Sequence, residues 1–170
     1  MAFGPEIGIR NDLRPGDIGY LVRWHGVLYA QECGWDYTFE AYVAGPLAEF
    51  ALSHNDRERI WLMEKDGVVV GSIAVVEAGE DEAQLRWLLV HPDLRGQGMG
   101  RFLMEEALGF CRERTYRRAF LWTVSSLRAA GNLYQSLGFV VTEEKTHRLW
   151  GAWLTEQRYE LGLKVTGKEG

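Results

Sequence analysis

Apolar residues recur along this chain at two spacings. Short runs rich in valine, isoleucine and leucine predict strands, and longer segments whose apolar residues fall three and four positions apart predict helices. In chain order the pattern predicts a strand, two helices, three strands, a helix, a strand, a helix and two strands, at Ile7–Arg10, Ile18–Cys33, Thr38–Ser53, Arg59–Lys65, Val68–Glu77, Ala83–Val90, Gly98–Arg114, Ala119–Val124, Leu127–Leu137, Phe139–Thr146 and Trp153–Leu161.

Turn residues separate these elements. Asp66-Gly67 lies between two strand runs and is typical of a two-residue hairpin. Arg14-Pro15-Gly16 predicts a turn with Asp17 as the N-cap of the first helix, and Gly45-Pro46 predicts a kink in the second. The order of elements predicts an α/β (α+β) fold, with a mixed, mostly antiparallel seven-stranded sheet flanked by four helices.

The strand at Ala83–Val90 leads into the most distinctive stretch of the chain. Regular alternation along it predicts two faces, one with Gln84, Arg86, Leu88 and Val90 and the other with Leu85, Trp87 and Leu89. After His91-Pro92 follows a turn with three glycines, Arg95-Gly96-Gln97-Gly98-Met99-Gly100, which opens the third helix. The unpaired N–H groups and the dipole of a helix N-terminus favour an anion there.

A glycine-rich turn need not bind an anion, and the neighbouring residues limit which kind of turn this is. It could be only a tight connection between strand and helix. It is not a Walker A loop, because no Gly-Lys-Ser/Thr follows. As a dinucleotide fingerprint it lacks the third glycine spacing and the acidic residue expected about 20 positions further on.

Composition limits the class of protein. A chain of 170 residues with 46% hydrophobic content predicts one domain, 1–170. A net charge of −5 argues against nucleic-acid binding, and Cys33 and Cys111 lack partners at metal-ligand spacing, so we expect no metal. Met1–Arg10 does not resemble a signal peptide and no run is long enough to cross a bilayer, so we expect a cytoplasmic protein with no membrane partner.

Two stretches together resemble the GCN5-related N-acetyltransferase (GNAT) superfamily. Val90-His91-Pro92 followed by Arg95-Gly96-Gln97-Gly98-Met99-Gly100 is similar to its motif A, and Leu133-Tyr134-Gln135-Ser136-Leu137-Gly138-Phe139 is similar to the end of its fourth helix. The segment around His25-Gly26 and Gly34-Trp35-Asp36 further resembles the acetyltransferase half of bacterial MarR–GNAT fusion proteins.

The resemblance implies a fold, a cofactor and a set of contacts. Two neighbouring parallel strands splay apart in that fold, with acetyl-CoA (coenzyme A) between them and two N-terminal helices as a lid over the substrate. The residues implied in cofactor binding are those of the motif strand and the turn, namely Leu88, Leu89, Val90, Arg95, Gly96, Gln97, Gly98, Met99, Gly100 and Arg101. Within this set the Leu88 N–H is implied to polarise the thioester carbonyl.

Tyr134 stands where the family keeps the tyrosine that protonates the departing thiolate. A phenol held against a thiolate is an adequate proton donor. The chain departs from the family seven positions earlier, where Leu127 replaces a frequent asparagine, and Ser125, Ser126 or Asn132 are the available substitutes.

More than one residue could serve as the general base. Gln84 occupies the position of a catalytic glutamate in some relatives, and an amide cannot take a proton. Glu32 is therefore the first candidate, as base or as a group that orients a cation, followed by Glu40, a water relay and His25. Acceptor contacts are assigned to Tyr29, Trp35 and Arg86, with Tyr37 and Trp87 as further aromatic candidates.

These residues predict an acetyl-CoA-dependent N-acetyltransferase. Its acceptor would be a primary amine, on a small molecule, an amino acid or a protein, attacking directly in a ternary complex. The aromatic and acidic residues suit a cationic amine. An acyl-CoA-binding sensor with little turnover is the alternative, a protein binding another nucleotide is a third, and a homodimer through the terminal strands is left open.

Overall fold

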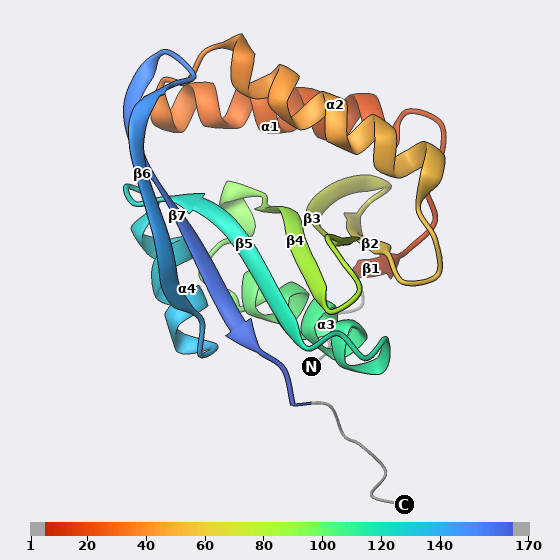
Figure 1. Cartoon of the computed structure of the whole chain (residues 1–170). Helices are drawn as coiled ribbons and strands as arrows, with labels where there is room; N and C mark the ends of the chain where they lie inside the picture. Colours follow the sequence, from red (N-terminus) through yellow and green to blue (C-terminus); the bar gives the residue numbers. More distant parts are fainter. Residues whose placement is uncertain (1–5, 165–170) are drawn as a thin grey trace, which may run out of the picture.

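The computed structural model describes residues 6–164, which form a seven-stranded sheet with helices on both faces (Figure 1). The sequence also predicts a polar tail over Lys164–Gly170, which beyond Lys164 lies outside this range. The elements in chain order are β1 (Ile7–Arg10), α1 (Asp17–Cys33), α2 (Tyr37–Ser53), β2 (Arg59–Lys65), β3 (Val68–Glu77), β4 (Glu82–Val90), a 3-10 turn (Pro92–Leu94), α3 (Met99–Glu113), β5 (Arg118–Val124), α4 (Arg128–Ser136), β6 (Val140–Leu149) and β7 (Ala152–Gly162).

The sheet has the order β1-β2-β3-β4-β5-β7-β6, and β4 with β5 is its parallel pair. These two strands pair over a short length, from Glu82 opposite Arg118 to Gln84 opposite Phe120. Beyond Gln84 the described residues form no further β4–β5 pairs, so the strands part toward their carboxyl ends. The splay implied by the family resemblance is confirmed, and it opens the sheet at its centre.

Two hydrophobic clusters hold the layers together, one on each face of the sheet. On one face α3 packs through an apolar stripe that includes Leu103, Ala107 and Cys111, all fully buried. On the other face α1 and α2 pack through residues such as Leu21 and Leu47. Helix α3 thus covers one face of the sheet, and α1 with α2 covers the opposite face.

A β-bulge in β4 changes the direction of its side chains. Two residues, Trp87 and Leu88, lie opposite the single residue Ile73 of β3, and Trp87 has a positive φ of 55°. The hydroxyl of buried Ser72 donates a 2.7 Å hydrogen bond to the Trp87 carbonyl oxygen. The Ser72 hydroxyl thus satisfies the Trp87 carbonyl at the bulge, where the regular pairing of β3 with β4 is interrupted.

The regular alternation predicted for β4 is therefore wrong beyond Arg86. Leu85 packs in the cluster beneath α3, whereas Trp87 packs in the cluster beneath α1 and α2. Leu88 and Val90 then return to the α3 side. The extra residue of the bulge shifts the two-residue period, so that Leu85 and Trp87 face opposite sides of the sheet.

Local turn chemistry was predicted with mixed success. Asp66 and Gly67 both have positive φ, 52° and 76°, as a two-residue hairpin of this type requires. Gly16, not Asp17, is the N-cap of α1, and the Asp17 carboxylate instead binds the Arg10 guanidinium, with Nη1 and Oδ2 2.7 Å apart. Within residues 6–164, no helix is both long and apolar enough to cross a membrane.

Candidate active site

A cavity of about 680 Å³ occupies the splay between β4 and β5. Such a volume falls in the usual range for small-molecule and cofactor sites. Residues from α1, α2, β4, the glycine-rich turn, α3, β5, α4 and the β6–β7 hairpin line it. Most residues predicted for the cofactor, for catalysis or for the acceptor line it, namely Tyr29, Glu32, Trp35, Arg86, Leu88, Leu89, Val90, Arg95, Gly96, Gly98, Met99, Gly100, Arg101 and Tyr134.

The glycine-rich turn lines this cavity at the start of α3. Gly96 and Gly98 have φ of 74° and 81°, a conformation that favours glycine, and a Cβ at either position would meet no described atom within 4 Å. Gly98 is the N-cap of α3, and no side chain of the described residues caps the helix. The open space and the uncapped helix start fit a diphosphate, whose oxygens accept from the backbone N–H groups of a helix N-terminus.

An ion pair ties this turn to helix α1. The Arg95 Nη1 atom lies 2.8 Å from Oε1 of Glu32, and Arg95 Nε donates to the Val90 carbonyl oxygen at 3.2 Å. Both side chains line the cavity and are partly exposed. The two predicted roles, Arg95 toward phosphate and Glu32 toward the amine, thus fall on directly paired groups.

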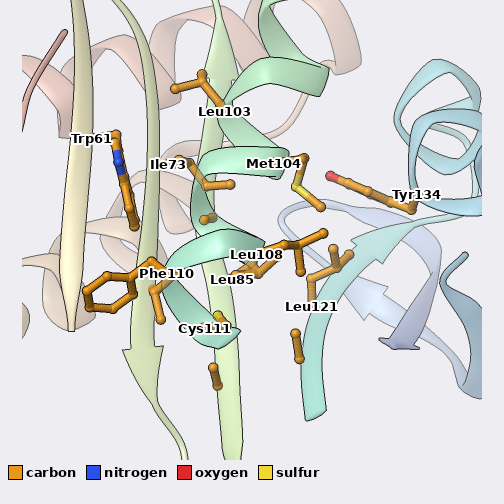
Figure 2. Packing of buried hydrophobic residues seen from close by; sticks show 14 of the residues in the cluster. Trp61, Ile73, Leu85, Leu103, Met104, Leu108, Phe110, Cys111, Leu121 and Tyr134 are labelled. Atoms are coloured by element: carbon orange, nitrogen blue, oxygen red, sulfur yellow. The ribbon is translucent and has the colours of Figure 1, made fainter. Parts of the chain in front are cut away.

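Tyr134 of α4 is buried within the core cluster of α3 and lines the cavity. In Figure 2 its hydroxyl points toward Met104 of α3, another cavity residue. Burial raises the pKa of Tyr134 above its ordinary value, and the nearby hydroxyls of Tyr29 and Tyr159 raise it further. Tyr134 therefore keeps its proton near neutral pH and presents a hydrogen-bond donor.

His25 of α1 contributes an unpaired nitrogen. Its Nδ1 lies 2.7 Å from the carbonyl oxygen of Leu21, which can only accept, so Nδ1 carries the proton. Nε2 is then a lone-pair acceptor, buried and without a partner in the described part of the chain. Burial lowers the pKa of His25 to about 4, so the imidazole is neutral at physiological pH.

Aromatic rings form a continuous wall on the α1–α2 side of the cavity. Tyr29 stacks on Trp35 with ring centroids 5.0 Å apart, and Trp35 lies 4.6 Å from Trp150, which lies 5.4 Å from Tyr42. We refer to these rings, together with Phe39, as the aromatic wall; all five line the cavity. The wall offers a surface for an apolar group.

Trp150 reaches the wall from the far end of the chain. It stands with Gly151 at the tip of the β6–β7 hairpin, and both have positive φ. Its carbonyl oxygen accepts a 3.0 Å hydrogen bond from the N–H of Asp36, just before α2. Figure 1 shows the hairpin tip meeting the start of α2. Sequence reasoning missed Trp150 because only this contact brings it to the cavity.

Several predicted residues lie elsewhere. Gln97 is in the turn but does not line the cavity, and Tyr37 is exposed at the start of α2, so its assignment to the acceptor pocket is wrong. Glu40 lies against Gly26 of α1, outside the cavity. The candidate substitutes for the missing asparagine, Ser125, Ser126 and Asn132, are also outside it, whereas Leu127 lines it. Among residues 6–164 no group of side chains could hold a metal ion.

Known proteins similar in sequence are acetyltransferases. The acetyltransferase (GNAT) family model matches residues 24–139. An uncharacterized N-acetyltransferase of Schizosaccharomyces pombe is 31% identical over 125 residues, which are 70% of this chain and 74% of that protein. An amino-acid acetyltransferase of Shewanella oneidensis is 34% identical over 87 residues, which are 51% of this chain but only 19% of that protein.

Solved structures share the fold at lower identity. YncA of Salmonella typhimurium, solved with its cofactor acetyl-CoA, is 20% identical, with a TM-score of 0.68 over 94% of this chain and 95% of that one. An N-acetyltransferase of Staphylococcus aureus Mu50 is also 20% identical, with a TM-score of 0.75 over 93% of this chain and 99% of that one. The family model covers most of the chain, and the chain therefore belongs to the acetyltransferase (GNAT) family.

Proposed function

We propose that this protein is an acetyl-CoA-dependent N-acetyltransferase whose acceptor is a primary amine. The observation that carries the proposal is the cavity in the splay of β4 and β5, which brings the open N-terminus of α3 and the buried Tyr134 hydroxyl to one space. Bound acetyl-CoA supplies an acetyl group as a thioester, which the amine attacks directly so that a C–N bond forms and the C–S bond breaks.

The glycine-rich turn holds the donor by its phosphates. We assign the phosphates to the backbone N–H groups from Gly96 to Gly100, at the uncapped start of α3, where the helix dipole adds to their attraction for an anion. Arg95 and Arg101 supply guanidinium groups at the same mouth of the cavity. Such fixed donors need little reorganisation on binding, which favours affinity.

The bulge in β4 sets the oxyanion contact. Beyond Gln84 the edge of β4 that would face β5 has no strand partner among the described residues, so its backbone groups are available to an extended ligand. We assign the Leu88 N–H to the thioester carbonyl, where a fixed donor stabilises the charge that develops on oxygen. Ser72 fixes this backbone through its bond to the Trp87 carbonyl oxygen.

Tyr134 serves as the general acid. Its hydroxyl stays protonated because burial raises its pKa, and it donates that proton to the sulfur of the leaving thiolate. The same low-polarity surroundings disfavour a free thiolate, so a proton is most useful there. Transfer from a phenol to a thiolate then restores the neutral thiol of coenzyme A.

Glu32 is our candidate for the general base. Its carboxylate lines the cavity beside Arg95, on the helix that covers the acceptor side. The unpaired Nε2 of His25 is a further acceptor on the cavity wall, but the lowered pKa of His25 makes it a weak base, better suited to accept a hydrogen bond. We therefore place the amine proton on Glu32, directly or through water.

Three finer assignments stay predictions. These are the cytoplasmic location, the likeness to the acetyltransferase half of MarR–GNAT fusions, and a homodimer. Strand β6 is at the edge of the sheet and Val140 and Trp153 are exposed, 61% and 73%, on the terminal strand pair. An exposed edge of this kind supports pairing with a second copy.

Calorimetry with acetyl-CoA tests the proposal first. We expect saturable binding at one site per chain, which coenzyme A displaces and which ATP or NAD at the same concentration does not. Because both alternatives carry phosphate groups, this comparison separates recognition of the pantetheine arm by β4 from general phosphate binding. Equal displacement by ATP would contradict the assignment of the splay to acetyl-CoA.

A further inference from the structure

More positively than negatively charged side chains line the cavity. Four arginines and two glutamates line it. Both glutamates are already paired, Glu32 with Arg95 at 2.8 Å and Glu156 with His147 at 2.6 Å. In the absence of a donor, the Glu32 carboxylate is therefore paired with a guanidinium and the Glu156 carboxylate is bound to an imidazole, so neither is a free anion.

Arg86 of β4 is an arginine of the cavity whose guanidinium lies near two aromatic rings. Within the part of the chain that the structure describes, its side chain makes no ion pair or hydrogen bond, although it is half-buried. Its guanidinium carbon lies 5.1 Å from the ring centroid of Trp87 and 5.7 Å from that of Tyr42. The rings hold the side chain and leave its N–H donors unused.

Arg86 also stands close to the reacting end of the cavity. It follows Gln84, the last residue of β4 that pairs with β5, by two positions. Leu88, whose N–H we assign to the thioester carbonyl, is two positions further on, at most roughly 7 Å along an extended backbone. A carboxylate held by Arg86 would therefore belong to the same small molecule as the attacking amine.

We propose that the acceptor is an amino acid with an apolar or aromatic side chain, whose carboxylate binds the Arg86 guanidinium and whose side chain lies on the aromatic wall. This inference rests on the proposed transferase function and names its substrate class. A planar guanidinium matches a carboxylate with two parallel hydrogen bonds, and the rings of Trp35, Tyr42 and Trp150 supply apolar area nearby.

The test compares L-phenylalanine with L-phenylalaninamide, which differ at the carboxylate alone. Thiol release from acetyl-CoA gives kcat/KM for each, and we expect the acid to be favoured at least about 30-fold. The amide has the less basic amine, so ionisation of the amine would favour the amide and cannot produce this preference. A wild-type protein that uses the amide equally well or better would overturn the inference.

Variants assign the preference to one residue. Arg86→Gln should reduce the ratio of the two kcat/KM values to near one, and Arg86→Lys should restore part of it. Arg23→Gln is the matched control, because Arg23 is exposed on α1 and does not line the cavity. Arg128, on α4, also lines the cavity. A loss that is equal for both acceptors in Arg86→Gln, or a ratio that collapses in Arg128→Gln instead, would overturn the assignment to Arg86.

A binding measurement separates this inference from the proposed function. Tryptophan fluorescence of the protein saturated with coenzyme A reports the occupation of the wall through Trp35 and Trp150. N-acetyl-L-phenylalanine should bind at least about 30-fold more tightly than its amide, and Arg86→Gln should remove the difference. If no acceptor releases thiol but this difference in affinity is present, the transferase proposal is wrong and the carboxylate site is supported. Equal affinity for N-acetyl-L-phenylalanine and its amide would overturn the carboxylate site.

Discussion

Arg95 Nη1 lies 2.8 Å from Oε1 of Glu32, across 63 positions of sequence. This contact joins the turn to which we assign the donor phosphates to helix α1, on which Glu32 is our candidate base. In that proposal, a pyrophosphate and the Glu32 carboxylate would compete for one guanidinium. Binding of the donor would draw on Arg95 and leave the Glu32 carboxylate less neutralised, which is the state in which it serves best as a base.

Replacing Glu32 with Gln removes the proton acceptor and keeps the size of the side chain. We expect kcat to fall about 100-fold, with a change in the KM for acetyl-CoA below about 3-fold, because general-base catalysis contributes on this scale. Steady-state thiol release measures both constants. Glu40→Gln, on α2 outside the cavity, is the matched control and should match the wild type. A raised KM with unchanged kcat would show that Glu32 only positions Arg95.

Tyr134→Phe removes one hydroxyl from a buried ring. We expect turnover to fall about 100-fold or more, while calorimetry gives an unchanged affinity for acetyl-CoA, since the proton is needed only as the thiolate leaves. Tyr159→Phe is the control: its ring lies 5.5 Å from that of Tyr134 but does not line the cavity. Equal turnover in Tyr134→Phe and the wild type would remove Tyr134 from the acid role.

Gly98→Ala tests the turn. A Cβ at this position meets no described protein atom, but φ is 81°, so we expect a loss of about 1 kcal/mol in unfolding free energy and an acetyl-CoA Kd raised about 10-fold. Gly109→Ala, within α3 and equally open, should instead stabilise the protein by about 0.5–1 kcal/mol and leave Kd unchanged. Urea unfolding and calorimetry measure both; an unchanged Kd in Gly98→Ala contradicts the phosphate assignment.

Because His25 is buried as a neutral imidazole, we expect the unfolding free energy to fall in mild acid. Its pKa is about 4 in the folded protein and near 6.5 in the unfolded chain, so the unfolded chain binds the additional proton as pH falls from 6.5 to 4. Between pH 7 and pH 5 the unfolding free energy should fall by about 2 kcal/mol more in the wild type than in His25→Gln. Urea titrations at the two pH values measure the difference, and parallel losses would show that His25 is not buried neutral.

Element boundaries could be predicted closely because they depend on local chemistry. Hydrophobic period, Asp66-Gly67 and the glycine-rich turn each act within a few residues, and the strands and helices begin and end within three residues of their expected positions. Several cavity residues could be predicted for the same reason, because the glycine-rich turn and Tyr134 each lie within a short sequence motif.

Features that depend on distant contacts could not be predicted. The bulge at Trp87 has no glycine to mark it, and its carbonyl is paired by Ser72 from the neighbouring strand. Trp150 joins the aromatic wall only because the hairpin tip binds the N–H of Asp36. Ion pairs such as Glu32–Arg95 form between elements that only the fold brings together, so the pairing of the cavity charges could not be predicted.

The most direct test of the central claim is thiol release from acetyl-CoA by the purified protein across amino acids, amines and peptides, with mass spectrometry of the acceptor. We predict release that depends on the acceptor, a product heavier by one acetyl group on its amine, and loss of both in Tyr134→Phe. Tight binding of acetyl-CoA with no acceptor-dependent release from any of these compounds would contradict the transferase and favour a protein that senses acyl-CoA.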